Sequence, residues 1–172
     1  MDENISVATS KDIDKLILLI NSAYRGESAK KGWTHEASLI EGDSRIDKDS
    51  LEKMMIDPNA TILKYEENEQ IFGCVYLEKK NSSLYLGLLS VSPDVQAKGI
   101  GKKLLKAAEE HALLINCNKI EMTVITMRTR LIAWYERHGY HQTNQTQPFP
   151  ENERFGTPVK PLEFVVMEKL IW

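Results

Sequence analysis

The sequence lacks long apolar runs. Its longest apolar stretches, such as residues 16–20 and 84–89, are far shorter than the roughly 20 residues that a membrane-spanning helix requires. The chain begins Met1-Asp2-Glu3, whereas a secretory leader begins with basic and then apolar residues. We therefore expect a cytoplasmic protein with no membrane partner.

An excess of positive charge is also absent. Lys and Arg number 22 and Asp and Glu number 25, which gives a formal net charge of -3. Proteins that bind nucleic acid through its phosphates need a basic face. The charge balance therefore speaks against a nucleic-acid-binding domain.

Cysteine is scarce, with two residues in the chain. Cys74 lies in an apolar, strand-like run, and Cys117 follows a helix-like run with no second Cys or His at the spacing of a metal site. We expect buried, unreactive thiols and no metal cofactor, with metal or redox chemistry as the lesser alternative.

Apolar periodicity divides the chain into helices and strands. Spacings of three and four predict helices over residues 13–24, 50–55, 100–115 and 128–138. Alternating or continuous apolar residues predict strands over residues 5–8, 61–65, 71–77, 84–91, 119–125, 140–143 and 162–169. The polar segment 26–49 and the proline-rich segment 145–161 are expected as loops. With 172 residues, 42% of them hydrophobic and 27% charged, the pattern predicts one α/β domain spanning residues 1–172.

Residues 88–104 place an apolar strand, a glycine-containing loop and a helix start in succession. The start of a helix leaves backbone N–H groups unpaired and carries partial positive charge, so the turn at residues 96–101 can hold a phosphate group. Gly99 and Gly101 would let the backbone approach that anion closely. Three lysines add positive charge there: Lys98, Lys102 and Lys103. The competing interpretation is an amphipathic surface helix that two glycines happen to open.

Two familiar phosphate-binding motifs do not fit this loop. The sequence contains no G-x-x-x-x-G-K-[ST], which excludes a P-loop. Leu104 stands where a dinucleotide-binding fingerprint needs its third glycine, which excludes a Rossmann turn.

The run Gln96-Ala97-Lys98-Gly99-Ile100-Gly101, preceded by Leu89-Ser90-Val91, resembles the acetyl-coenzyme A signature of the GNAT N-acetyltransferase superfamily. The resemblance implies the acyl-CoA N-acyltransferase fold, an α/β fold with a mixed, mostly antiparallel sheet of about six to seven strands, splayed in the middle and flanked by about four helices. It also implies that acetyl-coenzyme A is the co-substrate. The residues implied to bind it are Leu89, Ser90, Val91, Gln96, Ala97, Lys98, Gly99, Ile100, Gly101 and Lys102.

The same resemblance implies how the strand before the signature acts. In the family this strand splays from its neighbour, and its backbone bonds the thioester and the pantetheine arm. The N–H of Leu89 is then expected to face the acetyl oxygen, and Val91 the pantetheine. Attack of an amine on a thioester builds negative charge on the carbonyl oxygen, which a preplaced donor stabilises.

A second match lies in Leu131-Ile132-Ala133-Trp134-Tyr135-Glu136-Arg137-His138-Gly139-Tyr140, which is similar to the family's later helix, so that the resemblance covers about residues 61–140. It implies that Tyr135 is the general acid that protonates the leaving thiolate, since a phenol with a pKa near 10 keeps its proton at neutral pH. On a helix without this match, such a tyrosine is more simply an aromatic that fills the space against the sheet. Arg128 replaces the Asn that is frequent seven residues earlier, so a coenzyme contact there is not implied.

The expected function is transfer of an acetyl group from acetyl-coenzyme A to a primary amine by direct attack in a ternary complex. The strand at 84–91 carries no carboxylate or histidine that could act as the base. Residue type alone offers Glu36, Glu78, Tyr85 and His141. The missing base leaves a second hypothesis, a non-catalytic acyl-coenzyme A sensor or interaction module on the same fold.

The acceptor is expected to bind near residues 32–45 and 145–161, where the side chains able to shape a pocket are Trp33, Arg45, Phe149, Arg154 and Phe155. The expected partners are acetyl-coenzyme A and an amine on a small molecule or a protein. A homodimer is left open.

Overall fold

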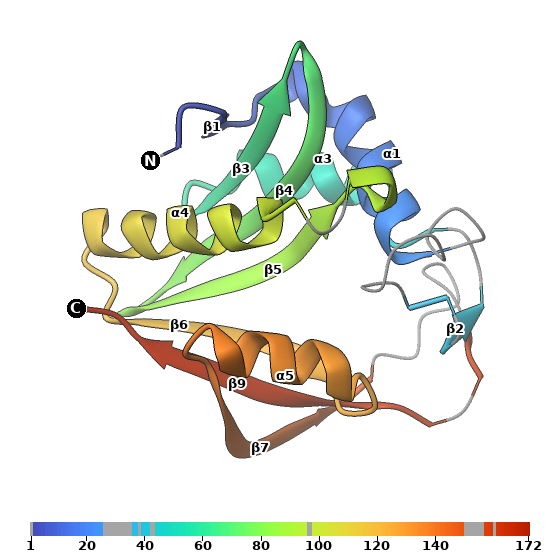
Figure 1. Cartoon of the computed structure of the whole chain (residues 1–172), viewed down its shortest axis with the longest axis vertical. Coiled ribbons are helices and arrows are strands. Elements are labelled where there is room, and N and C mark those ends of the chain that lie inside the picture. The colour runs from blue at the N-terminus through green and yellow to red at the C-terminus, as the bar shows by residue number, and fades with distance from the viewer. Residues whose placement is uncertain are drawn as a thin grey trace.

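The computed structural model describes residues 2–25, 36–37, 39–41, 44–95, 98–149, 157–159 and 161–172. A seven-stranded sheet in the order β1-β3-β4-β5-β6-β9-β7 forms its centre (Figure 1). Its strands are β1 (Ile5–Val7), β3 (Ala60–Glu67), β4 (Gln70–Lys80), β5 (Ser83–Val91), β6 (Lys119–Ile125), β7 (His141–Pro148) and β9 (Glu163–Leu170). A separate two-stranded sheet pairs β2 (Ile40–Glu41) with β8 (Thr157–Pro158).

The pairing of β5 with β6 is parallel and short, whereas the other neighbours in the large sheet are antiparallel. It joins Ser83–Tyr85 to Lys119–Glu121. Both strands continue beyond these residues without further pairing to each other, and Figure 1 shows them diverging toward the right of the view. The sheet is therefore splayed in the middle, which confirms the predicted fold class.

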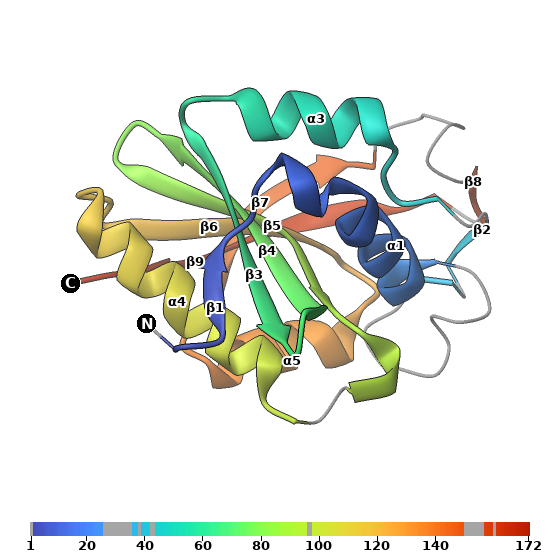
Figure 2. The ribbon, with the colours of Figure 1, turned by 90° about the horizontal axis from the view of Figure 1, so that it is seen from above.

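Helices cover both faces of the sheet. α1 (Ile13–Tyr24), which follows the short 3-10 helix η1 (Ser10–Asp12), lies with α3 (Lys48–Ile56) on one face, and α4 (Ile100–Leu114) and α5 (Thr129–Arg137) lie on the other (Figure 2). A second 3-10 helix, η2 (Pro93–Val95), connects β5 to the segment before α4. Within the described parts of the chain, none of the helices is long and apolar enough to cross a membrane.

Each face of the sheet has its own apolar core, and β4 contributes to both. Val75 and Leu77 pack with the α4 side, whereas Cys74 and Tyr76 pack with the α1 side. Successive side chains of a strand point to opposite faces, so a strand buried on both faces is apolar without interruption. This explains the continuous apolar run that predicted β4.

The proline-rich segment does not form the uninterrupted loop predicted for residues 145–161. Gln145–Pro148 completes β7, and Thr157–Pro158 forms β8. The side chains of β7 are exposed on both faces apart from Thr143, so its sequence has no apolar alternation from which a strand could be recognised. Similarly, Ile40–Glu41 of the predicted polar loop forms β2.

Candidate active site

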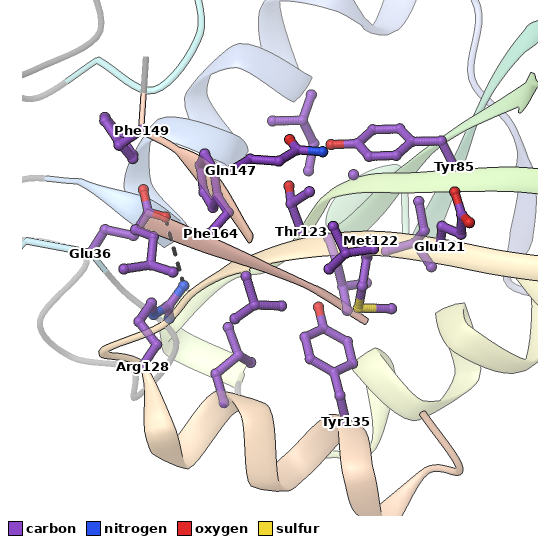
Figure 3. Close-up of a pocket in the computed structure, with 18 of the residues that line it drawn as sticks. Glu36, Tyr85, Glu121, Met122, Thr123, Arg128, Tyr135, Gln147, Phe149 and Phe164 are labelled. Atoms are coloured by element: carbon purple, nitrogen blue, oxygen red, sulfur yellow. Dashed lines mark ion pairs between the residues drawn. The ribbon is translucent and has the colours of Figure 1, made fainter. Parts of the chain in front are cut away.

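A pocket of about 600 Å³ lies where β5 and β6 diverge (Figure 3). Its walls come from both strands and from α1, α5, β7 and β9. The lining includes Tyr24, Arg25, Glu36, Arg45, Lys80, Tyr85, Leu88, Leu89, Glu121, Met122, Arg128, Tyr135 and Phe149. Splaying of the two strands therefore brings together residues from both halves of the chain.

A β-bulge interrupts β5 at this pocket. β4 and β5 pair up to Gly87 and again from Ser90, but Leu88 and Leu89 together lie opposite Val75. Leu88 has a φ of 51°, in the left-handed region that a leucine seldom adopts. Bulges of this kind bend a strand and redirect its backbone groups. The predicted oxyanion donor, Leu89, is thus part of an irregular backbone segment.

Side chains hold the two carbonyl groups of the bulge. The Leu88 carbonyl accepts from Ser90 Oγ at 2.9 Å and lies 3.9 Å from Cys74 Sγ. The Leu89 carbonyl accepts from Tyr24 Oη at 2.6 Å. Burial raises the pKa of Cys74 to about 12, which makes it the inert thiol that the sequence predicted.

The predicted coenzyme loop is described in part, because Gln96 and Ala97 lie outside the described residues. Gly99 is the N-cap of α4 and has a φ of 78°, a conformation that favours glycine. Gly101 follows in the first turn, and a Cβ added there would stand 3.4 Å from the indole ring of Trp134. Ile100 points into the core, which anchors the start of the helix.

The lysines of this loop differ in their surroundings. Lys98 and Lys102 are exposed. Lys103 turns toward the N-terminal segment, where its Nζ lies 3.7 Å from Asp2 Oδ2 and 5.4 Å from the centre of the Tyr65 ring. Lys98 and Lys102 are therefore the better placed of the three to meet an anion at the start of α4.

Tyr135 lies on α5 and is 5% exposed. Figure 3 shows its hydroxyl directed into the pocket from the α5 side, near Met122 of β6. Burial raises the pKa of Tyr135 well above its ordinary value, so the phenol keeps its proton at neutral pH. The residue predicted as the acid thus borders the pocket in its protonated form.

A buried ionic cluster closes one end of the pocket. Glu36 lies 3.1 Å from Nε of Arg25, 3.8 Å from Nη1 of Arg128 and 4.0 Å from Nε of Arg45. Figure 3 shows the Glu36–Arg128 pair joining the start of α5 to the segment after α1. Burial lowers the pKa of Arg25, and the neighbouring Glu36 opposes that shift. Arg128, whose contact was open from the sequence, is therefore engaged with Glu36.

The candidates for a base occupy unequal positions. Tyr85 and Glu36 line the pocket, but the Glu36 carboxylate is already engaged in ion pairs with three arginines. Glu78 accepts from Tyr76 Oη at 2.6 Å, and His141 lies 3.5 Å from Glu168. Neither of these two is among the lining residues that the structure describes.

Sequence reasoning missed several lining residues. Glu121 is paired with Lys119 at 2.7 Å, and Tyr24 had been assigned only to the apolar stripe of its helix. Arg45 and Phe149, which the sequence predicted to shape an acceptor site, line the pocket between β5 and β6. The other three residues of that prediction, Trp33, Arg154 and Phe155, lie outside the described residues. Over the described ranges, no group of three or more His, Cys, Asp or Glu side chains is placed to hold a metal ion.

The family model for the acetyltransferase (GNAT) domain matches residues 34–153. The chain therefore belongs to the GNAT acetyltransferase family, a class of enzymes that use acetyl-coenzyme A, and the predicted resemblance is confirmed.

Among curated proteins, the chain is similar to the spermine/spermidine N(1)-acetyltransferase of Bacillus subtilis (strain 168), with 33% identity over 64 residues. That match covers 37% of this chain and 42% of that protein, so it spans less than half of either. An uncharacterised protein of the same organism, YdhI, is 27% identical over 114 residues, which cover 65% of this chain and 62% of YdhI.

Solved structures match the chain over nearly its full length. A ribosomal-protein-alanine N-acetyltransferase from Brucella melitensis superposes with a TM-score of 0.72 at 18% identity, covering 97% of this chain and 99% of that one. The PaiA N-acetyltransferase from Thermoplasma acidophilum, in complex with coenzyme A, gives 0.70 at 18% identity and covers 99% of each chain. At such identities the likeness concerns the fold.

Proposed function

We propose that the chain transfers an acetyl group from acetyl-coenzyme A to a primary amine by direct attack in a ternary complex. One observation carries the proposal: Leu89 of the bulge and Tyr135 both line the pocket where β5 and β6 diverge, and the first turn of α4, at Gly101, lies against Val91 of β5 and Trp134 of α5. These are the three parts that the reaction needs, namely an oxyanion donor, a phosphate site and an acid.

The coenzyme would bind along β5 and the start of α4. α4 has 15 residues, and the N–H groups of its first turn can bond the pyrophosphate, with Lys98 and Lys102 at the surface beside them. Gly99 and Gly101 place no side chain between their own backbone and the pyrophosphate, and Gln96 and Ala97 belong to the same proposed loop. The pantetheine arm would then follow Val91 toward Leu89. The side chain of Ser90 is occupied within the strand, so its proposed contact is through the backbone.

The N–H of Leu89 is the proposed oxyanion donor. The C=O and N–H of a trans peptide point in opposite directions. The Leu88 carbonyl is directed toward Ser90 Oγ and Cys74 Sγ, the latter on β4. The N–H of the same peptide, that of Leu89, is therefore directed away from β4. Such a donor stabilises the tetrahedral intermediate more than the thioester, because negative charge develops on the oxygen as the amine attacks.

Tyr135 would act when the intermediate collapses. The C–S bond breaks, and the thiolate of coenzyme A takes the phenolic proton from Tyr135. The raised pKa of Tyr135 keeps that proton in place before the thiolate forms. The amine must lose a proton to become the amide nitrogen, and no unpaired carboxylate lines the described pocket, so water in the pocket is the proposed acceptor of that proton.

The acceptor is proposed only as a primary amine. The Bacillus subtilis relative is a spermine/spermidine acetyltransferase, but the described lining offers a polycation little attraction. It holds four cationic side chains, Arg25, Arg45, Lys80 and Arg128, and two carboxylates, Glu36 and Glu121, which are both in ion pairs. Because both carboxylates of the described lining are paired, neither is free to act as a base. This favours a second candidate function, a non-catalytic acyl-coenzyme A sensor.

Calorimetric titration with acetyl-coenzyme A, followed by an amine screen that measures free thiol release, tests the proposal. Micromolar binding and turnover on an amine are the expected results. Tight binding without turnover on any amine would favour the sensor. Absence of binding at millimolar coenzyme would exclude both functions.

A further inference from the structure

Two hydroxyl groups hold the peptides on either side of Leu89. Ser90 Oγ donates to the Leu88 carbonyl at 2.9 Å, and Tyr24 Oη donates to the Leu89 carbonyl at 2.6 Å. Tyr24 is the last residue of α1 and is 65 positions away from its acceptor, so this bond joins a helix end to the bulge. We infer that Tyr24 and Ser90 are positioning residues that fix the direction of the Leu89 N–H toward the acetyl oxygen.

The Ser90 bond acts on the peptide that carries this N–H. That peptide joins Leu88 to Leu89, and because it is planar, fixing its carbonyl also fixes its N–H. Ser90 is buried, 2% exposed, and its hydroxyl remains within the strand. A serine is thus suited to this position because its side chain is short enough to bond the carbonyl two residues earlier.

The Tyr24 bond acts on the following peptide. Tyr24 Oη is the side-chain donor to the Leu89 carbonyl, and the adjoining Leu88 has the strained φ of 51°. Holding both peptides leaves Leu89 little freedom to rotate out of this conformation. Burial raises the pKa of Tyr24 to about 12, so its hydroxyl remains a donor at neutral pH.

This inference rests on the proposed function, since it gives the Leu89 N–H its role. A positioning role and a purely structural role predict different effects on catalysis. A donor that is turned away loses its bond to the acetyl carbonyl, while the phosphate and pantetheine contacts of the coenzyme remain. Loss of this bond should therefore shift the infrared band of the acetyl carbonyl and lower kcat. The affinity for coenzyme A should stay the same.

The test uses isotope-edited infrared spectra of carbonyl-labelled acetyl-coenzyme A bound to the wild type, Tyr24→Phe and Ser90→Ala. We expect the carbonyl band of the wild-type complex to lie below that of the free ligand, and to move back toward it in both variants. On an amine identified by the screen, kcat should fall about tenfold, less than the roughly 100-fold loss that follows outright removal of an oxyanion donor. The Kd for coenzyme A, from calorimetry, should stay within about twofold of the wild-type value.

Tyr76→Phe is the matched control. Tyr76 also packs on the α1 side of the sheet, and its hydroxyl donates to Glu78 at the same distance of 2.6 Å, outside the described pocket lining. Its removal should leave the carbonyl band unchanged. An unshifted band in folded Tyr24→Phe and Ser90→Ala that still bind the ligand would overturn the inference while the proposed function stands. If the carbonyl band of the wild-type complex equals that of the free ligand, the Leu89 N–H is not a donor to the acetyl oxygen. If the wild type does not bind acetyl-coenzyme A, the proposed function itself is excluded.

Discussion

The rings of Tyr135 and Tyr140 meet edge to face, with centroids 5.9 Å apart and planes inclined by 70°. Their hydroxyl groups have different surroundings. Tyr135 points into the pocket, whereas Tyr140 Oη is buried and has no hydrogen-bond partner among the described residues. The two phenols share one apolar environment, and only the first borders the proposed site.

Tyr135→Phe should lower kcat by about 100-fold or more, because the thiolate would then leave without a proton from the enzyme. Calorimetry should give an unchanged Kd for acetyl-coenzyme A. Tyr140→Phe is the control and should keep wild-type activity, since its hydroxyl is buried without a bond and its removal sacrifices none. Equal activity in Tyr135→Phe and the wild type would remove Tyr135 from the mechanism.

The pH dependence of kcat should rise and then level off. A neutral amine is the attacking species, so activity increases as the acceptor loses its proton. Burial raises the pKa of Tyr135 above its ordinary value, so the acid stays protonated and no fall is expected up to about pH 10. The profile is measured by thiol release in the wild type and in Tyr135→Phe. A decline below about pH 10 that is present only in the wild type would contradict the raised pKa of Tyr135.

Glu36→Gln should destabilise the fold, because it removes the charge that compensates buried Arg25. The side chains of this pair are 9% and 2% exposed. Breaking a buried pair typically costs 3–5 kcal/mol, and we expect about 3 kcal/mol because Arg25 also donates to the Ser44 carbonyl. Urea unfolding without ligand measures the effect.

Asp14→Asn serves as the comparison for that experiment. Asp14 lies 3.8 Å from Lys48, and both side chains are largely exposed. Exposed pairs contribute little, so the unfolding midpoint should not move. A similar loss in both variants would mean that burial does not govern the Arg25–Glu36 pair.

Gly73→Ala should destabilise the contact between β4 and α4. An added Cβ would stand 2.8 Å from Ile100 Cγ2 and 3.2 Å from the Ser90 carbonyl oxygen. Overpacking of this kind costs about 1–3 kcal/mol. Trimming Ile100 in Gly73→Ala/Ile100→Ala should recover part of the loss, so the two changes should be less than additive in a double-mutant cycle of unfolding free energies. Full additivity would show that the two residues do not meet.

The sequence predicted elements best where burial leaves a periodic pattern. The predicted strand at 119–125 has the bounds of β6, because its inward residues alternate and are buried. β7 was predicted too short, since a strand exposed on both faces shows no alternation, and the two-residue strands β2 and β8 are defined by pairing with each other. A strand of two residues is too short to show a periodic pattern in the sequence.

The site also combines features that a local sequence pattern predicts with features that it does not. The loop before α4 and the position of Tyr135 follow from continuous segments, which a motif can represent. The bond from Tyr24 to Leu89 and the approach of Glu36 to Arg128 join residues far apart in the chain. Neither partner is recognisable alone, because a tyrosine on an apolar stripe and a glutamate in a polar segment are ordinary surface or core residues.

The short ladder between β5 and β6 has a thermodynamic consequence. It leaves two half-sheets, β1-β3-β4-β5 and β6-β9-β7, that pair over Ser83–Tyr85 and Lys119–Glu121. A ligand seated between them contacts both and becomes part of what holds the halves together. Its binding energy then adds to the stability of the whole sheet, by about 2.7 kcal/mol when the ligand is present at 100 times its Kd. With the coenzyme bound at the proposed site, unfolding of the sheet would therefore also require release of the ligand.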